Sequence, residues 1–131
     1  MRVPKFRAWD KLGKIMLPIG DIDTSYKLVY LEEDNGYRCE RDFDEIELMQ
    51  STGLKNKKGY EIFEGDIIKF SNYYDDVYVA PVVCDKNYAC FGVSFSGAYP
   101  ISFEYLEEFY TELKDIEVVG NIYENPELLR G

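Results

Sequence analysis

Two acidic residues at one corner of the chain are the first candidates for chemistry. The chain has 131 residues and no histidine, so general acid–base catalysis would fall to carboxylates, tyrosine, lysine or cysteine. Glu64 and Asp66 flank Gly65, and they would share one face of a strand that ran through both, as a small carboxylate-dependent hydrolase requires. The alternative is a backbone corner, in which the Asp66 carboxylate accepts hydrogen bonds from nearby N–H groups. We favour the corner.

Two further acidic pairs could hold a hard cation. Asp21 and Asp23 are two positions apart, and Asp75 is followed directly by Asp76. Calcium needs about six or more oxygen ligands from a shaped loop, and the spacing of an EF-hand is missing from the sequence. We therefore expect no metal at either pair.

The cysteines are poor candidates for catalysis. Cys39, Cys84 and Cys90 form no Cys-x-x-Cys motif. Cys84 and Cys90 would flank a hairpin turn and could lie near each other, but an odd count without a secretory signal indicates reduced thiols that pack as small apolar groups. A nucleophilic cysteine also needs a neighbouring base such as histidine. The segment Gly92–Ser96 begins like a Gly-x-Ser-x-Gly nucleophile elbow but lacks the last glycine.

A short basic loop contains Lys55, Lys57 and Lys58. Such a loop could touch phosphate, but the sequence has neither a Walker motif nor a Gly-x-Gly-x-x-Gly motif. We interpret it as a solvated turn between short strands. Together with the acidic pairs and the cysteines, this leads us to expect no catalytic residue, no cofactor and no metal ligand.

The charge of the chain argues against direct binding of nucleic acid. The net charge is −10, with −7 in residues 20–50, −6 in residues 101–131 and +4 in residues 1–19. Binding to DNA or RNA is driven by counterion release at a positive face, which this composition does not provide. No signal peptide and no apolar run of about 20 residues is present, so we expect a cytoplasmic protein with no membrane association.

The hydrophobic pattern predicts an α+β fold that is predominantly β. We expect a single domain over residues 1–131, in which an N-terminal hairpin region (1–50) packs on a barrel-like region (51–131). The order of short strands after Gly65 is typical of a small, partly open SH3-like barrel with flanking hairpins, one amphipathic helix and a short C-terminal helix. The apolar side chains that suit its core are Phe6, Trp9, Ile62, Ile67, Val119 and Ile122.

The N-terminal region reads as two hairpins. Alternating residues and a polar turn predict a hairpin over residues 5–17, and Pro18 to Asp23 have the composition of a loop. The dipeptide Asn35-Gly36 predicts the turn of the second hairpin.

The C-terminal region combines strands with helices. Pro81 lies inside a predicted strand over residues 77–84, and because proline lacks an N–H donor we expect that strand to be an edge or to carry a bulge. Ser102 would cap a helix that ends at Asp115, and Asn125 would cap the C-terminal one. The apolar stripe of the longer helix is Leu106, Phe109, Tyr110 and Leu113.

Three segments in this order resemble the YopX family, whose members are small proteins encoded by phages and prophages. They are Lys5–Asp10, Met49–Ile67 and Val118–Leu129, and the similarity spans almost the whole chain. The resemblance implies a strand-rich α+β fold with an SH3-like barrel, self-association, and a phage or prophage origin within a bacterial host cell. It implies no activity and no catalytic residues.

Three functions follow as hypotheses. The first is a non-enzymatic, oligomeric binding or assembly module, which binds itself and an unidentified phage or host protein through exposed Tyr and Trp side chains. The second is an acidic inhibitor of a host DNA-binding protein, in which the acidic clusters of residues 20–50 and 101–131 mimic phosphates. The third, which we disfavour, is a small hydrolase that uses Glu64 and Asp66.

Overall fold

A computed structural model of the chain shows a protein built mainly of β-strands. The structure describes residues 5–32, 36, 38–56, 58–85, 90–95, 100–109 and 115–129. The contacts of the chain separate it into two compact units, Met1–Ser51 and Thr52–Gly131, which we call the N-terminal unit and the C-terminal unit. All strand pairs are antiparallel in the described part of the chain, so the prediction of a predominantly β fold is confirmed.

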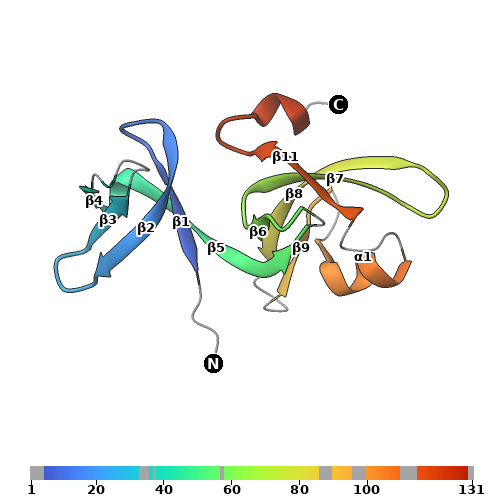
Figure 1. The fold of residues 1–131 in the computed structure, drawn as a ribbon, viewed down its shortest axis with the longest axis horizontal. Helices are drawn as coiled ribbons and strands as arrows, with labels where there is room; N and C mark the ends of the chain where they lie inside the picture. Colours follow the sequence, from blue (N-terminus) through green and yellow to red (C-terminus); the bar gives the residue numbers. More distant parts are fainter. Residues whose placement is uncertain are drawn as a thin grey trace. The chain divides into compact units, whose positions relative to one another are not determined.

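The N-terminal unit is a sheet with the strand order β4-β3-β2-β1-β5 (Figure 1). Its elements are β1 (Phe6–Asp10), β2 (Ile15–Asp23), β3 (Leu28–Glu32), β4 (Arg38–Asp42), the 3-10 helix η1 (Phe43–Glu45) and the first half of β5 (Ile46–Lys55). The predicted first hairpin is confirmed as β1 and β2. The side chains that form the core of this unit are Ala8, Leu17, Val29, Leu31 and Ile46.

The predicted loop from Pro18 to Asp23 is wrong, because β2 continues through it. The first part of β2 pairs with β1 as far as Pro18, and the rest pairs with β3 from Ile19 onwards. The register shifts between Ile19 and Asp21, so a bulge absorbs Gly20. A proline and a glycine within a strand are tolerated here because they stand where the strand exchanges one neighbour for the other. Of the predicted second turn, Gly36 has a φ of +85° and Asn35 lies outside the described residues.

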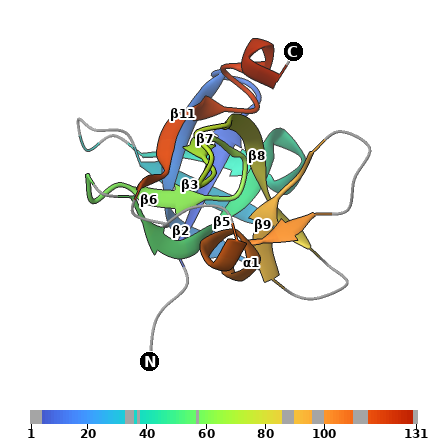
Figure 2. The ribbon, with the colours of Figure 1, turned by 90° about the vertical axis from the view of Figure 1, so that its right-hand side faces the viewer.

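The C-terminal unit contains a five-stranded sheet with the order β10-β9-β8-β7-β11, which Figures 1 and 2 show from two sides. Its elements are the second half of β5, β6 (Glu61–Phe63), β7 (Asp66–Ser71), β8 (Val77–Asp85), β9 (Cys90–Val93), β10 (Ile101–Ser102), α1 (Phe103–Phe109), β11 (Glu117–Asn121) and the 3-10 helix η3 (Pro126–Leu129). β6 pairs beside β5. The described strands do not close into a barrel.

One face of this sheet packs on a large apolar core. Its buried members are Ile62, Ile68, Phe70, Ala80, Val82, Val93, Phe103, Leu106 and Ile116. The rings of Phe70, Tyr78 and Phe95 pack against one another with centroid distances of 5.5 to 6.4 Å. Ile62 and Ile67 are buried as predicted, whereas Phe6, Trp9 and Ile122 are only half-buried.

The amphipathic helix begins where the sequence predicted. The Ser102 hydroxyl accepts a hydrogen bond from the Tyr105 N–H at 3.2 Å, as an N-cap does. Leu106 is fully buried, and α1 packs beside β9 and β10 (Figure 2). The described helix ends at Phe109, and residues 110–114, on which part of the predicted stripe falls, lie outside the described residues.

Pro81 neither makes β8 an edge strand nor marks a bulge. β8 lies between β7 and β9, pairing with β7 up to Pro81 and with β9 from Val82 onwards, with no register shift in the described pairs. The Ser94 N–H donates to the Pro81 carbonyl at 3.1 Å, so the Pro81 nitrogen faces the same side, just beyond the end of the β9 ladder. The missing donor therefore interrupts no run of paired residues.

Val119 is exposed and does not belong to the core, contrary to prediction. The register between β11 and β7 shifts between Val118 and Gly120, which leaves Val119 as the extra residue of a bulge. A bulge inserts one unpaired residue and so alters the alternation on which the sequence prediction depended.

Candidate functional site

The corner formed by Glu64, Gly65 and Asp66 is structural. The buried Asp66 carboxylate accepts a hydrogen bond from the Phe63 N–H at 2.8 Å, so the predicted corner is confirmed. Gly65 has a φ of +88° and bonds through its N–H to the Val82 carbonyl. β7 begins only at Asp66, so Glu64 and Asp66 do not share a strand face.

The other acidic pairs bind backbone or side chains of their own loops. The Asp23 carboxylate accepts hydrogen bonds from the N–H groups of Ser25 and Tyr26, and the Asp76 carboxylate accepts one from the side-chain amide of Asn72. Within the described ranges, no group of three or more His, Cys, Asp or Glu side chains has the geometry of a metal site.

The cysteines are half-buried and none forms a disulfide. In the β8–β9 ladder Cys84 stands opposite Phe91, while Cys90 stands opposite Asp85. Because side chains alternate between the faces of a sheet, Cys84 and Cys90 point to opposite faces. Proximity in the hairpin therefore does not bring the two thiols together.

The basic loop is a turn organised by Asn56, which the sequence analysis did not single out. The Asn56 side-chain oxygen accepts hydrogen bonds from the backbone N–H groups of Lys58 and Tyr60, each at 3.0 Å, and the Asn56 N–H donates to the Tyr60 carbonyl. Asn56 is 8% exposed, whereas Lys55 and Lys58 are exposed. Lys57 lies outside the described residues. The predicted solvated turn is confirmed at the positions that the structure describes.

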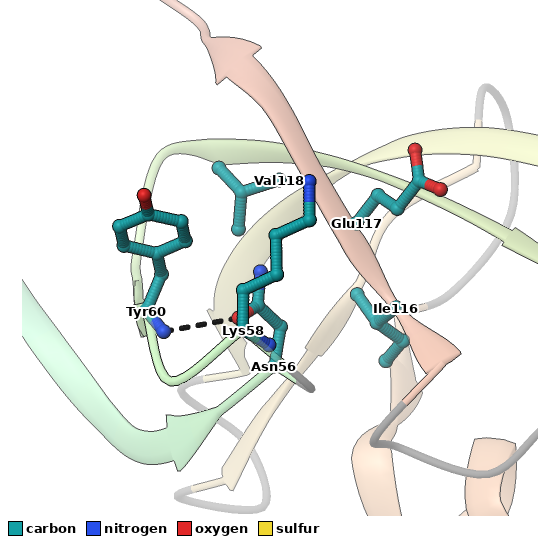
Figure 3. Close-up of a pocket in the computed structure, with 6 residues that line it drawn as sticks. All are labelled: Asn56, Lys58, Tyr60, Ile116, Glu117 and Val118. Carbon is teal, nitrogen blue, oxygen red and sulfur yellow. Dashed lines mark hydrogen bonds between the residues drawn. The ribbon is translucent and has the colours of Figure 1, made fainter.

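Beside this turn lies a small pocket of about 90 Å³ (Figure 3). One wall is the turn, and the other is β11 with the residue before it. The lining residues are Asn56, Lys58, Tyr60, Ile116, Glu117 and Val118. Ile116 is fully buried and Val118 half-buried, while Tyr60 is 65% exposed, so the pocket has an apolar floor and an aromatic rim.

The N-terminal unit buries an ion pair between Asp10 and Arg41. Arg41 donates from Nε to one carboxylate oxygen of Asp10 at 2.9 Å and from Nη2 to the other at 3.1 Å. Burial disfavours the ionised carboxyl, but the hydrogen bonds from Arg41 and from the backbone of Gly13 and Leu12 outweigh it and hold the pKa of Asp10 below its usual range. The pair is separated by 31 residues, and the only hint in the sequence is an aspartate at a hairpin turn.

Acidic side chains surround Tyr30 on β3. Partial burial, followed by the charges of Glu40, Asp23 and Asp21, raises the pKa of the Tyr30 hydroxyl. Glu40 and Asp21 stand directly opposite Tyr30 on the two neighbouring strands. This surface carries the acidic character that the sequence placed in residues 20–50.

The outer face of the C-terminal sheet carries exposed aliphatic side chains on both sides of Lys69, which stands opposite Val79 of β8 and Glu117 of β11. Val77 and Val79 of β8 and Val119 of β11 point away from the core and are 58%, 39% and 37% exposed. At one end η3 packs against β8 and adds Leu128 and Leu129, which are also exposed. We call these five residues the outer apolar face. The sequence did not predict it: Val119 was assigned to the core, and Val77 and Val79 were placed only within a strand.

Comparison with known protein families decides what kind of protein this is. The family model described as YopX protein matches residues 5–130. The chain belongs to the YopX family. The search of curated proteins gives no match.

Two solved structures resemble the chain along nearly its whole length. The crystal structure of protein EF1440 from Enterococcus faecalis is 30% identical, with a TM-score of 0.63, and the match covers 98% of this chain and 99% of that one. The crystal structure of the protein yopX from Bacillus subtilis is 22% identical, with a TM-score of 0.60, and the match covers 95% and 97% of the two chains. The second comparison shows the fold alone, and neither structure's description states a function.

In the part of the chain that the structure describes, no helix is both long enough and apolar enough to cross a bilayer.

Proposed function

We propose that this YopX-family protein is a non-enzymatic binding or assembly module that associates with itself and with another phage or host protein. The observation that carries the proposal is the outer apolar face. Three of its five exposed aliphatic side chains stand on strands of a sheet whose opposite side is anchored in the core, and the other two stand on η3. Exposed apolar clusters of this kind are enriched at protein–protein interfaces.

Exposed tyrosines extend the surface available for association. Tyr26, Tyr60, Tyr73 and Tyr74 are between 61% and 87% exposed. Tyrosine contributes a large apolar ring and a hydroxyl that can stay hydrated, which suits the rim of an interface. Trp9 is half-buried and therefore contributes less than the sequence suggested.

Affinity capture with matched variants tests the proposal. The tagged full chain, a Val77→Lys/Val79→Lys double variant and a Leu48→Lys control would be used to capture proteins from host lysate with and without phage infection. Leu48 is a 47% exposed strand residue of the N-terminal unit. We expect the captured set to be lost with the double variant and kept with the control. Identical sets from all three folded chains, or no set at all, would refute the proposal.

The acidic surroundings of Tyr30 favour a second candidate, an inhibitor that presents carboxylates in place of DNA phosphates to a host DNA-binding protein. A complex of this kind depends on charge and should weaken steeply between low and moderate salt. The captured host protein should stay bound after nuclease treatment and should dissociate when salt is added. It should also bind an Asp21→Asn/Glu40→Gln variant less well. Retention in high salt would exclude this candidate.

The remaining expectations are part of the same proposal. We retain an SH3-like arrangement of the C-terminal strands, a phage or prophage origin and a cytoplasmic location in the host cell. We also retain that direct binding of nucleic acid and association with a membrane are absent. The third hypothesis, a hydrolase using Glu64 and Asp66, gains no support, since Asp66 is engaged by its own backbone corner.

A further inference from the structure

β4 is the last strand of the sheet in the N-terminal unit and pairs on one side only. Its neighbour is β3, and within the described ranges no strand pairs with its other side (Figure 1). In an antiparallel ladder, residues that bond to the neighbouring strand alternate with residues whose N–H and C=O groups point away from it. The Phe43 N–H donates to the Lys27 carbonyl at 3.2 Å, in the same register as the ladder of β3 and β4. The backbone groups of Arg38, Glu40 and Asp42 therefore point to the open side of β4.

Two hydrogen bonds at this edge agree with that assignment and limit where a new strand can pair. The Asp42 N–H donates to the Glu45 carboxylate at 2.8 Å, and the Glu40 carbonyl accepts from Nη1 of Arg41 at 2.7 Å. The Asp42 N–H is therefore occupied, whereas a carbonyl oxygen can accept a second hydrogen bond. Pairing with an added strand is thus confined to the segment from Arg38 to Glu40, where both of these side chains are exposed.

This edge is complementary to itself. When two copies of β4 run antiparallel with Cys39 opposite Cys39 of the second copy, Arg38 of each copy stands opposite Glu40 of the other. Both Arg–Glu pairs can exchange backbone hydrogen bonds, and opposite charges on directly facing residues stabilise such pairs. Centring the pairing on Glu40 or Arg41 instead would need the occupied Asp42 N–H. Centring it on Arg38 would place two arginines opposite each other. Charge and backbone therefore select one register.

We propose that the β4 edges of two copies of this chain pair in this register and join their N-terminal sheets into one continuous sheet. Pairing limited to Arg38–Glu40 of each copy makes a contact smaller than those that hold proteins together on their own. The outer apolar face must therefore first bring the copies close, which raises the effective concentration of the edges. The inference rests on the proposed self-association and adds a second, defined contact to it.

Disulfide cross-linking at Cys39 tests the register. Facing residues that do not bond through their backbones have Cα atoms about 4.5 Å apart, within the range that a disulfide spans. The probe is the full chain with Cys84→Ala and Cys90→Ala, which leaves Cys39 as its only thiol. It would be oxidised with diamide at a concentration where light scattering shows association. We expect a covalent dimer on a non-reducing gel, and far less of it when Val77→Lys/Val79→Lys is added.

Charge variants separate edge pairing from chance collisions of thiols. Glu40→Lys places positive charges opposite each other in both pairs and should lower the cross-linked fraction about tenfold. Arg38→Glu/Glu40→Lys exchanges the two charges and should restore the fraction. Asp21→Lys is the matched control, because Asp21 is an exposed acid opposite Tyr30 on β2, away from the edge, and it should leave the fraction unchanged.

Three results would each overturn the inference. They are the absence of a covalent dimer from a chain that light scattering shows to associate, an unchanged fraction in Glu40→Lys, and an equal loss in Asp21→Lys. The first result would also be found if a strand of a different protein occupied the edge. A wild-type chain that stays monomeric at every concentration would instead refute the proposed self-association, and this contact with it, so the two failures are distinguishable.

Discussion

β2 in the N-terminal unit and β8 in the C-terminal unit are both nine-residue strands that exchange one neighbouring strand for another at a proline. Pro18 ends the pairing of β2 with β1, and Pro81 ends the pairing of β8 with β7. The two units differ in what holds the sheet together. The first has a small aliphatic core and a buried Asp10–Arg41 ion pair, whereas the second has a larger core with three packed rings.

Because of this difference, the stability of the two units should depend on different kinds of change. Stability that depends on apolar burial changes with side-chain volume and hardly with pH between neutral and acid. A carboxylate that is ionised in a buried pair contributes stability only while it stays ionised. We therefore expect the C-terminal unit to respond most to cavities and backbone strain, and the N-terminal unit to charge and acid.

The largest effect should come from Phe70→Ala. Phe70 is 2% exposed and contacts both Tyr78 and Phe95, so its removal leaves a cavity that should lower the free energy of unfolding by about 3–5 kcal/mol. Hydrogen exchange should accelerate in β7 to β9 and much less in β2 and β3. Tyr74→Ala, at an 87% exposed position, is the control, and equal losses for the two variants would remove the distinction between core and surface.

A somewhat smaller effect is expected from Gly65→Val. The φ of +88° is unfavourable for a β-branched residue, which should lower the free energy of unfolding by about 2–3 kcal/mol in urea titrations. Lys58→Ala, at an exposed position of the same unit, should change it by less than about 0.5 kcal/mol. An unchanged free energy of unfolding for Gly65→Val would show that a side chain does not strain the corner.

In the N-terminal unit, Asp10→Asn tests the ion pair. The amide keeps the shape of the carboxylate but leaves the partly buried Arg41 guanidinium without its counter-charge, which should lower the free energy of unfolding by about 1–2 kcal/mol at neutral pH. Glu32→Gln, which breaks the half-exposed pair with Arg38, should lower it by at most about 1 kcal/mol. If Glu32→Gln lowered the free energy of unfolding more than Asp10→Asn does, burial would add nothing to the stability that the Asp10–Arg41 pair contributes.

The smallest and most specific effect concerns pH. The difference in the free energy of unfolding between the wild-type chain and Asp10→Asn should depend on it. Folding lowers the pKa of Asp10, so the unfolded chain binds the proton more readily than the folded chain. The stabilisation by the ion pair is therefore fully present above the ordinary aspartate pKa of 3.8, and it is lost as the pH falls through the pKa that Asp10 has in the folded chain. Urea titrations of the wild-type chain and Asp10→Asn should therefore converge as the pH drops below about 4. A constant gap down to the acid limit would contradict the assigned pKa shift.

Particular residues show how much of the structure could be predicted from the sequence alone. Ser102 and the Asp66 corner were predicted correctly because capping and turn formation depend on neighbours in the chain. Pro18 and Pro81 were misjudged because their tolerance depends on which strand lies beside them, which local composition does not encode. The exposure of Val119 followed from a bulge that only the pairing with β7 reveals.

The binding features were the least visible in the sequence. The outer apolar face joins residues from β8, β11 and η3, and the pocket joins a turn to a strand about 60 positions away, so neither has a contiguous motif. Asn56 read as an ordinary turn residue, and its fixed amide orientation depends on two hydrogen bonds that form only in the folded turn.

Light scattering coupled to size-exclusion chromatography tests the central claim, association through the outer apolar face, most directly. For the wild-type chain, we expect the mass to rise above that of the 15.3 kDa monomer as the loading concentration increases to the high micromolar range, and to return to it in Val77→Lys/Val79→Lys. A mass of 15.3 kDa for the wild-type chain at every concentration would contradict self-association.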